Sequence, residues 1–226
     1  MDDRYRALMK ERPEKFAEAK EEASIRIITD ETQISRVQEG LGKEIGVIYE
    51  DDYILLLRDA VVFPDGNRGA YVRILAKEPG SAAVILPVVN GKILLLEHYR
   101  HSLREPMWEI PRGFGERGLS PEENARKELA EETGIKEVRM QYLGEVCPDS
   151  GMQGTTASIY MAQIQGSVDI KNLDEREAIM GYRLASYEEL GMLVRQGKLK
   201  DGFTLSALAL AMLQEYGEKR QEDDLT

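Results

Sequence analysis

Cysteine and histidine are scarce in this sequence, which has one cysteine and two histidines among 226 residues. Cys147 has no second cysteine with which to form a disulfide in the chain, and this favours an intracellular setting. His98 and His101 stand close together, but a zinc site needs further histidine or cysteine ligands. We therefore interpret both histidines as ordinary strand-end residues and not as metal ligands.

Long apolar runs and an excess of positive charge are also absent. No stretch approaches the roughly 20 apolar residues that span a bilayer, and residues 1–10 lack the apolar core of a signal peptide. Thirty lysines and arginines face 41 aspartates and glutamates, so the net charge is −11. That balance argues against binding to a nucleic-acid backbone. We expect a cytoplasmic protein with no membrane partner and no nucleic-acid partner.

The composition, 42% hydrophobic and 31% charged, is typical of a globular protein, and 226 residues suffice for one domain plus a subdomain. Apolar side chains at Tyr5, Leu8, Met9 and Phe16 form a weak stripe that we interpret as packing. Pro79-Gly80 interrupts the later strand pattern and is the expected domain boundary. Periodicity and turn signals predict helices at 13–23, 121–133, 187–195 and 204–216, and strands at 45–49, 53–58, 71–76, 82–89, 93–98, 108–111, 138–143, 157–164 and 179–184.

The most informative stretch is residues 113–135, a glycine-broken loop followed by a helix. Ser120-Pro121-Glu122-Glu123 is a capping box with proline at the first helical position, and Gly134 is the residue expected to end the helix. Glu128, Glu131 and Glu132 stand at i, i+3 and i+4, which places three carboxylates on one narrow face. The three carboxylates either face solvent as ordinary surface charges or bind a hard divalent cation.

This stretch resembles the signature of the Nudix hydrolases, which has a glycine, a spaced glutamate, then Arg-Glu-apolar-x-Glu-Glu-x-Gly-apolar. The matching positions are Gly113, Glu128, Leu129, Glu131, Glu132, Gly134 and Ile135. Leu119 stands where the family has the spaced glutamate, and Lys127 stands where it has the arginine. In the family those two side chains commonly pair and brace the loop. Because both are replaced together, we expect no unpaired partner and an intact metal site.

The resemblance extends more loosely over residues 45–215, with similarity to ADP-ribose pyrophosphatases at 59–63, 71–73, 97–100, 108–113 and 186–208. It implies the Nudix α/β/α sandwich with a mixed sheet, an α/β (α+β) fold carrying a small N-terminal antiparallel β subdomain. The expected divisions are a helical extension at 1–40, a β subdomain at 41–80 and the Nudix domain at 81–226. Relatives with this subdomain are usually homodimers that build each site from both chains, so we expect a homodimer.

The implied reaction is hydrolysis of a diphosphate that joins a nucleoside to another group, with two or more Mg²⁺ or Mn²⁺ ions as cofactors. Glu128 and Glu132 are the expected metal ligands because they lie one helical turn apart. The resemblance adds the main-chain carbonyl of Arg112. It also implies that Glu131 binds a metal ion or a water molecule beside one.

Two positions compete for the general base, which many relatives carry on a loop beyond the signature helix. In one alignment of that loop, the expected position of the base falls near Thr155, whose side chain cannot act as a base. The other candidate lies in the acidic segment 174–177, where we choose Glu177 as the base. The alternative is that Glu177 is an ordinary charged residue on a solvent-exposed loop.

Arg73, Arg100 and Glu109 are the candidate substrate-binding residues, each with an alternative role. The two arginines match positions that contact substrate phosphates in the family, or they form salt bridges. Glu109 either holds a water molecule beside a metal ion or pairs with Arg112.

The favoured function is hydrolysis of ADP-ribose to AMP and ribose 5-phosphate, or of a related sugar nucleotide. The same chemistry on a dinucleotide or a nucleoside triphosphate is a second possibility, and a non-catalytic nucleotide sensor is a third. Sensors of that kind often lose the signature carboxylates, which this chain retains at Glu128, Glu131 and Glu132.

Overall fold

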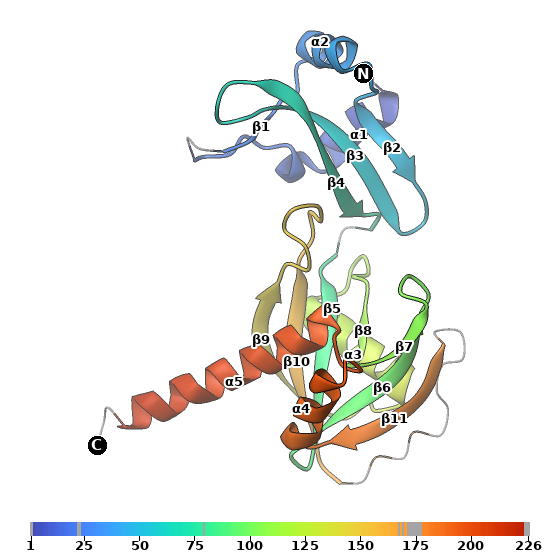
Figure 1. Ribbon diagram of the computed structural model, residues 1–226, viewed down its shortest axis with the longest axis vertical. Coiled ribbons are helices and arrows are strands. Elements are labelled where there is room, and N and C mark those ends of the chain that lie inside the picture. Colours follow the sequence, from blue (N-terminus) through green and yellow to red (C-terminus); the bar gives the residue numbers. More distant parts are fainter. Residues whose placement is uncertain are drawn as a thin grey trace. The chain divides into compact units, whose positions relative to one another are not determined.

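The computed structural model describes residues 2–21, 24–78, 80–166, 168, 170 and 178–223, without the side chains of 216–223. The chain divides into two compact units (Figure 1). Unit 1 contains residues 1–78 together with 149–155, and unit 2 contains residues 79–148 and 156–226. Among the described residues, no helix is long and apolar enough to cross a membrane.

Unit 1 is built on a four-stranded antiparallel sheet with β3 (Ile54–Val62) at its centre. β4 (Arg68–Ala76) pairs along the whole of β3, while β1 (Arg26–Ile27) and β2 (Gly46–Glu50) pair with different parts of it. The helices of this unit are α1 (Asp3–Glu11), the short 3-10 helix η1 (Pro13–Lys15) and α2 (Glu31–Leu41).

The helix predicted at residues 13–23 is wrong: α1 ends at Glu11, and beyond η1 the described residues through 21 are not helical. Pro13 disfavours helical geometry at Arg12 and so separates α1 from η1, which ends at Lys15. Asp2 caps α1 by accepting a hydrogen bond from the Arg4 amide at 3.1 Å. The packing interpretation of the apolar stripe is confirmed, because Tyr5, Leu8 and Phe16 are buried.

No break in packing separates residues 1–40 from the β subdomain. Tyr5, Leu8 and Ile34 share one hydrophobic core with the strand residues Leu55 and Leu57. The division expected at residue 40 therefore does not correspond to a structural boundary, because neither segment buries its apolar face without the other. The second unit begins at Pro79.

Unit 2 contains a seven-stranded mixed sheet in the order β11-β6-β5-β10-β9, with β7 paired to β6 and β8 paired to β5. β10 runs parallel to β5 and the other pairings are antiparallel. The strands are β5 (Ala82–Val89), β6 (Lys92–Arg100), β7 (Glu105–Glu109), β8 (Arg112–Gly113), β9 (Arg139–Val146), β10 (Ala157–Ile164) and β11 (Ile179–Ala185).

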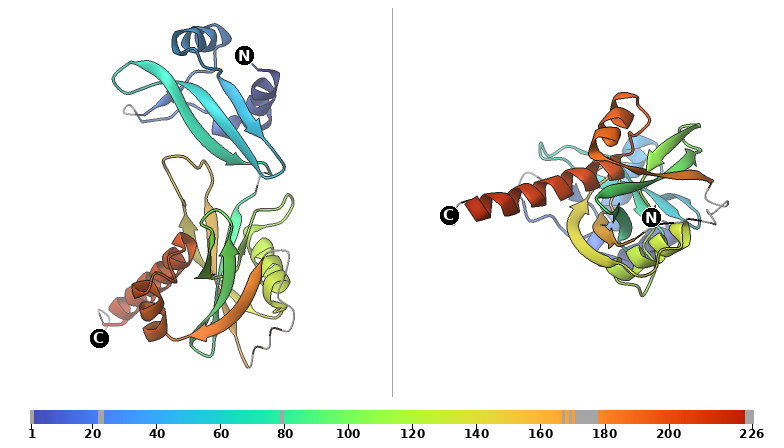
Figure 2. Two further views of the ribbon diagram at one scale, coloured as in Figure 1. Left: turned by 45° about the vertical axis from the view of Figure 1, so that its right-hand side comes forward. Right: turned by 90° about the horizontal axis from the view of Figure 1, so that it is seen from below.

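Helices cover both faces of this sheet (Figure 2). On β5, Ala83 and Ile85 pack against α3 (Pro121–Thr133), while Val84 and Leu86 belong to the core formed with α4 (Tyr187–Arg195) and α5 (Gly202–Asp223). Both faces of β5 are thus apolar, which explains its continuous hydrophobic run. The arrangement is the α/β/α sandwich expected from the sequence.

Candidate active site

The loop and helix at residues 113–133 form as the sequence predicts. The Ser120 hydroxyl accepts a hydrogen bond from the Glu123 amide at 3.3 Å, and the Glu123 carboxylate accepts one from the Ser120 amide at 2.8 Å. Gly134 ends the helix with φ of +75°. These contacts confirm the capping box and set the position at which α3 begins.

Glycine at position 113 lets the carboxylate of Glu128 lie against its backbone. A Cβ at this position would stand 2.0 Å from Cδ of Glu128, so a larger residue would force the Glu128 carboxylate to move. β8 holds Gly113 in place by pairing it with Ala83 of β5. The glycine thus lets the first carboxylate of α3 pack directly on the loop backbone.

The three carboxylates of α3 do not share one environment. Glu128 and Glu132 are buried and lie one turn apart, whereas the Glu131 side chain is 54% exposed. Glu132 accepts a hydrogen bond from the Arg112 amide at 3.5 Å, which brings the main chain of Arg112 beside it. Within the described residues, no three acidic, histidine or cysteine side chains converge into a ready-made metal cluster.

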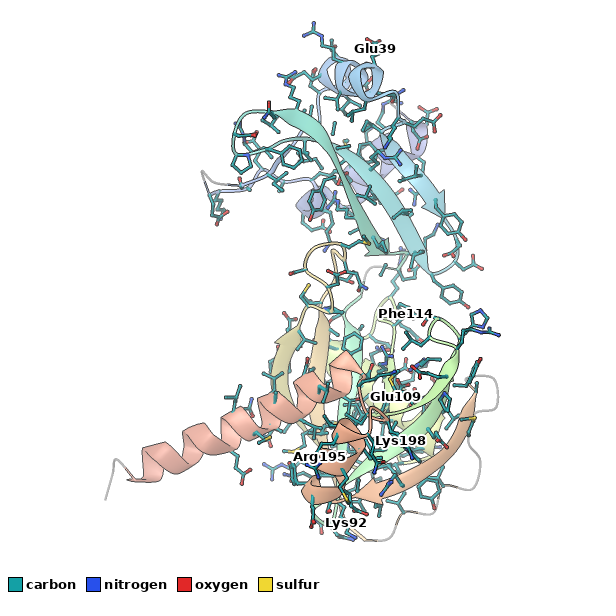
Figure 3. All side chains as sticks on the ribbon, viewed as in Figure 1. Glu39, Lys92, Glu109, Phe114, Arg195 and Lys198 are labelled. Atoms are coloured by element: carbon teal, nitrogen blue, oxygen red, sulfur yellow. The ribbon has the colours of Figure 1, made fainter. Side chains whose placement is uncertain are left out.

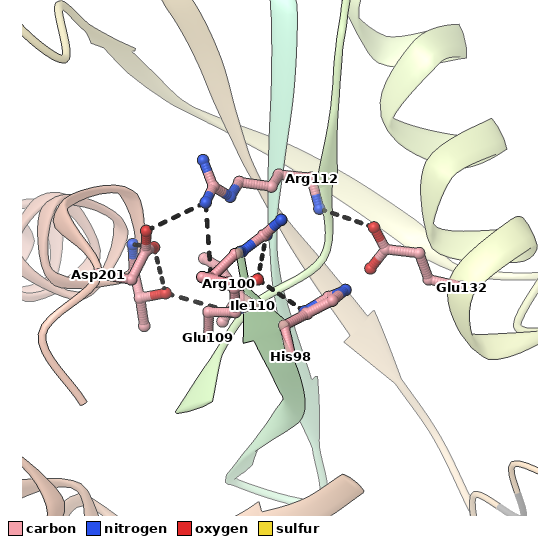
Figure 4. Close-up of polar contacts among 8 residues, drawn as sticks. His98, Arg100, Glu109, Ile110, Arg112, Glu132 and Asp201 are labelled. Carbon is pink, nitrogen blue, oxygen red and sulfur yellow. Dashed lines mark hydrogen bonds and ion pairs between the residues drawn. The ribbon is translucent and has the colours of Figure 1, made fainter. Parts of the chain in front are cut away.

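Arg112 links two sides of the site (Figure 4). Its amide faces Glu132, while its guanidinium lies 3.4 Å from both Glu109 and Asp201 and 4.8 Å from the centre of the Phe203 ring. The side chain therefore neutralises two carboxylates on the α5 side of the sheet. Its main chain stays next to α3.

Glu109 is a fully buried carboxylate surrounded by cationic groups. Residues 98, 100 and 109 share one face of the β6–β7 hairpin, since Leu96 pairs with Glu109 and His98 with Met107. His98 Nδ1 lies 2.6 Å from Glu109, and Arg100 binds both of its oxygens. Burial raises the pKa of Glu109, but hydrogen bonds from His98 and Arg100 and the charge of Arg112 outweigh it, so the pKa is lowered.

His98, Arg100 and Arg112 contact the two oxygens of Glu109 in this structure, and its role toward substrate stays a prediction. The alternative interpretation, pairing with Arg112, fits the geometry. Figure 3 labels Glu109, which is fully buried, and Phe114 on the loop, which is 61% exposed. Arg100 also forms a salt bridge, yet about a third of its side chain remains exposed.

Arg73 lies in unit 1 and its guanidinium is fully engaged there. It donates to Asp59 at 2.5 Å and to the Lys15 carbonyl at 2.8 Å, and it lies 5.0 Å from the centre of the Phe16 ring. Asp59 is buried and also accepts from the Tyr5 hydroxyl at 2.5 Å. The arginine therefore compensates a buried carboxylate, in line with the salt-bridge alternative, and its role toward substrate stays a prediction.

Lys127 braces the loop against the helix without the glutamate that the family has at position 119. Its ammonium group donates to Glu116 on the loop at 2.6 Å and to Glu131 on the helix at 3.0 Å. Hydrogen bonds to Glu116 and then to Glu131 raise the pKa of Lys127, which stays charged. The sequence comparison missed this pair because Glu116 stands three positions before the signature glutamate position.

Three polar residues of the site went unrecognised in the sequence. His98 contacts Glu109, Asp201 contacts Arg112, and Thr204 accepts from the Ile110 amide at 3.1 Å. The Thr204 amide and hydroxyl both donate to Asp201 at 2.8 Å. An aspartate before the apolar run of α5 was the available signal, because Asp-x-x-Thr is typical of a helix start.

A pocket of about 260 Å³ opens beside this network. Arg112, Asp201 and Phe203 contribute to its wall, together with Cys147, which follows β9, and Ser206 of α5. It lies next to the arginine that connects Glu109 with the α3 side of the site.

The two candidate positions for the general base have different outcomes. Glu177 lies outside the described residues. Its neighbour Ala178 is described, and its carbonyl accepts a hydrogen bond from the Tyr99 amide at 3.1 Å. Thr155 belongs to unit 1, at the end of the segment 149–155 that pairs with β4 through Gln153 and Ile74.

Comparisons with known proteins agree with this geometry. Residues 78–205 match the NUDIX domain family. A methanol dehydrogenase activator from Bacillus methanolicus is 30% identical over 169 residues, covering 74% of this chain and 90% of the relative. An ADP-ribose pyrophosphatase from Bacillus subtilis (strain 168) is 28% identical over 187 residues, covering 82% and 95%. A crystal structure of an ADP compounds hydrolase shares the fold, with a TM-score of 0.66, 20% identity, and coverage of 78% and 94%.

Proposed function

This chain belongs to the Nudix family of pyrophosphohydrolases, and from that premise we propose that its substrate is ADP-ribose or a closely related sugar nucleotide. Water attacks one phosphorus of the diphosphate and the bond to the bridging oxygen breaks, which gives AMP and ribose 5-phosphate from ADP-ribose. The observation that carries the proposal is the buried pair Glu128 and Glu132 in a chain similar to ADP-ribose pyrophosphatases: Glu128 packs against Gly113, and Glu132 accepts from the Arg112 amide.

The proposed cofactors are two or more Mg²⁺ or Mn²⁺ ions. The available donors suit them, since carboxylates and main-chain carbonyls are hard oxygen ligands. Glu128, Glu132 and the Arg112 carbonyl would hold the metal, with Glu131 as a further ligand or as the holder of a water molecule. When bound, such ions neutralise the diphosphate and activate water.

The remaining roles belong to the chain itself. Glu177 takes the proton of the attacking water, and the partly exposed Arg100 binds a phosphate of the substrate. Support for Glu177 comes from its neighbour, because Ala178 is anchored to Tyr99 at the end of the strand that carries Arg100. Exchange of Glu177 for glutamine is expected to lower kcat by about a thousandfold with metal affinity retained. The matched control, Glu175→Gln, stays within about twofold of the wild type.

A substrate panel tests the function directly. The purified chain is incubated with ADP-ribose, sugar nucleotides, NADH and nucleoside triphosphates in Mg²⁺ or Mn²⁺, and the products are separated by chromatography. AMP and ribose 5-phosphate from ADP-ribose support the proposal. If the chain prefers NADH or a triphosphate, the dinucleotide or triphosphate alternative is supported instead. If it hydrolyses none of these compounds, a nucleotide sensor is favoured.

We also propose a cytoplasmic homodimer, with residues 41–80 in the subunit interface and residues 81–226 as the catalytic domain. This part of the proposal rests on the sequence similarity to ADP-ribose pyrophosphatases. Light scattering after gel filtration measures the mass, which is expected to be twice the 25.5 kDa of one chain. A mass of one chain would contradict it.

A further inference from the structure

The loop at residues 113–119 is fastened to α3 at successive points along the helix. The Asn124 side chain donates to the Phe114 carbonyl at 2.9 Å. Lys127 binds Glu116 at 2.6 Å, and Glu128 lies against the backbone of Gly113. The loop position and the helix position are therefore coupled through side chains of α3.

Lys127 differs from the other anchors because it contacts the loop and the carboxylate face at once. Its second partner is Glu131, one turn further along α3 at 3.0 Å. Glu131 is adjacent to Glu132 and one turn from Glu128, so the negative charges of those two side chains repel its carboxylate. The lysine offers that carboxylate a fixed partner without burying it, since the Glu131 side chain is 54% exposed.

We propose that Glu116 and Lys127 form a positioning pair that holds the loop on α3 and orients Glu131 for the reaction. This inference rests on the proposed function and names two residues outside the expected ligand set. Exposed ion pairs contribute little to global stability, and the Lys127 side chain is 36% exposed. The effect is therefore local and is seen in loop order and in turnover.

The backbone at Gly113 lies directly against the Glu128 carboxylate. If the contact at Glu116 is lost, the loop keeps its contacts nearer the start, at Gly113, at Phe114 and at Gly115, which packs on the backbone of Gly80. Movement of the loop then changes the surface on which the Glu128 carboxylate rests. Removal of Lys127 also takes away the contact with Glu131, whereas removal of Glu116 leaves the Lys127–Glu131 pair in place.

The test compares the full chain with Lys127→Met, Glu116→Gln and the conservative Lys127→Arg. The matched control is Glu122→Gln, which removes the 2.8 Å pair between Glu122 and Arg126 on the same helix at similar exposure. Lys127→Met is the decisive variant because it leaves the loop sequence unchanged.

The first measurement needs neither substrate nor metal. Hydrogen exchange of the amides at residues 114–119, followed by mass spectrometry, is expected to quicken about fivefold in Lys127→Met and Glu116→Gln. Lys127→Arg and the control are expected to exchange as the wild type does. Equal exchange in all five proteins would overturn the inference.

The second measurement is turnover of the substrate found in the panel. Lys127→Met and Glu116→Gln are expected to lower kcat about tenfold and to raise the Mn²⁺ concentration for half-maximal rate, with KM changed less than twofold. Unchanged kcat in both variants also overturns the inference. If the wild type hydrolyses nothing, the proposed function fails, and the exchange experiment still decides whether the pair fastens the loop.

Discussion

Two groups of carboxylates in unit 2 differ in how their charge is compensated. Glu109 is fully buried and has His98, Arg100 and Arg112 around it. The face of α3 carries three glutamates, and the cation that contacts it, Lys127, binds the exposed one. Cationic partners on both oxygens compensate the buried charge of Glu109, whereas three carboxylates on one helix face suit an added cation. Carboxylates of the same residue type therefore differ in role because their neighbours differ.

The largest effect is expected when the α3 face is changed. Glu128→Gln and Glu132→Gln should each lower kcat at least about a thousandfold, because loss of a ligand removes charge stabilisation in the transition state. Wild-type protein should gain thermal stability when Mn²⁺ is added, and both variants should lose that gain. Differential scanning calorimetry and steady-state kinetics measure the two quantities. Activity within tenfold of the wild type would remove these residues from the metal site.

Exchange at the compensated carboxylate should instead weaken the fold. Glu109→Gln leaves the surrounding arginines without their counter-charge, and the expected loss is about 3 kcal/mol in the free energy of unfolding. Urea denaturation followed by circular dichroism measures it, with Glu105→Gln on the same strand as an exposed control. If the Glu109→Gln protein is stable but no longer turns over substrate, Glu109 takes part in the reaction and does not merely stabilise the fold.

Arg73 provides the same comparison in unit 1. Because it compensates the buried Asp59, Arg73→Met should lower the free energy of unfolding by roughly 2 kcal/mol. KM should stay unchanged, since the guanidinium is engaged by Asp59, Lys15 and Phe16. A large rise in KM with unchanged stability would show that the arginine binds substrate.

The pH dependence of stability should follow Glu109. Its pKa is lowered in the folded protein, so its contribution is complete above the ordinary glutamate pKa of about 4.5 and is lost as pH falls through the lowered value. Urea denaturation of the wild type between pH 3 and 6, the range about the glutamate pKa, should show stability falling toward the acid end. Glu109→Gln should flatten that part of the profile. An identical slope in both proteins would assign the acid sensitivity to other groups.

The smallest effect concerns the brace on the loop. Adding Leu119→Glu and Lys127→Arg to Glu116→Gln restores the family pattern, and it should recover most of the roughly tenfold loss in kcat expected for Glu116→Gln alone. Leu119→Glu combined with Glu116→Gln and Lys127→Met offers no cation and serves as the control. Equal recovery in both would mean that position 119 acts without a pair.

Much of unit 2 was predictable because its signals are local. The strands at 82–89 and 157–164 and the helices at 121–133 and 187–195 begin and end as predicted. Unit 1 was harder, since α1, α2 and β1 were missed. Asp30 and Gly42, which cap α2, were the available signals. The segment at 13–23 was misjudged because alanine, charge and a proline at its first position all suggest a helix, whereas the described part of the segment forms the short η1 at 13–15.

The resemblance to the Nudix signature predicted the α/β/α fold, and local sequence signals predicted the capped helix after a glycine loop and the placement of Glu128 and Glu132 one turn apart. Caps, turns and periodicity act over a few residues, so they can be read along the chain. Only the tertiary structure decided which charges meet: Glu109 with His98 and Arg112, Asp59 with Arg73, and Glu116 with Lys127. The physical reason is that a carboxylate takes its role from burial and from its neighbours, and packing of strands and helices sets both.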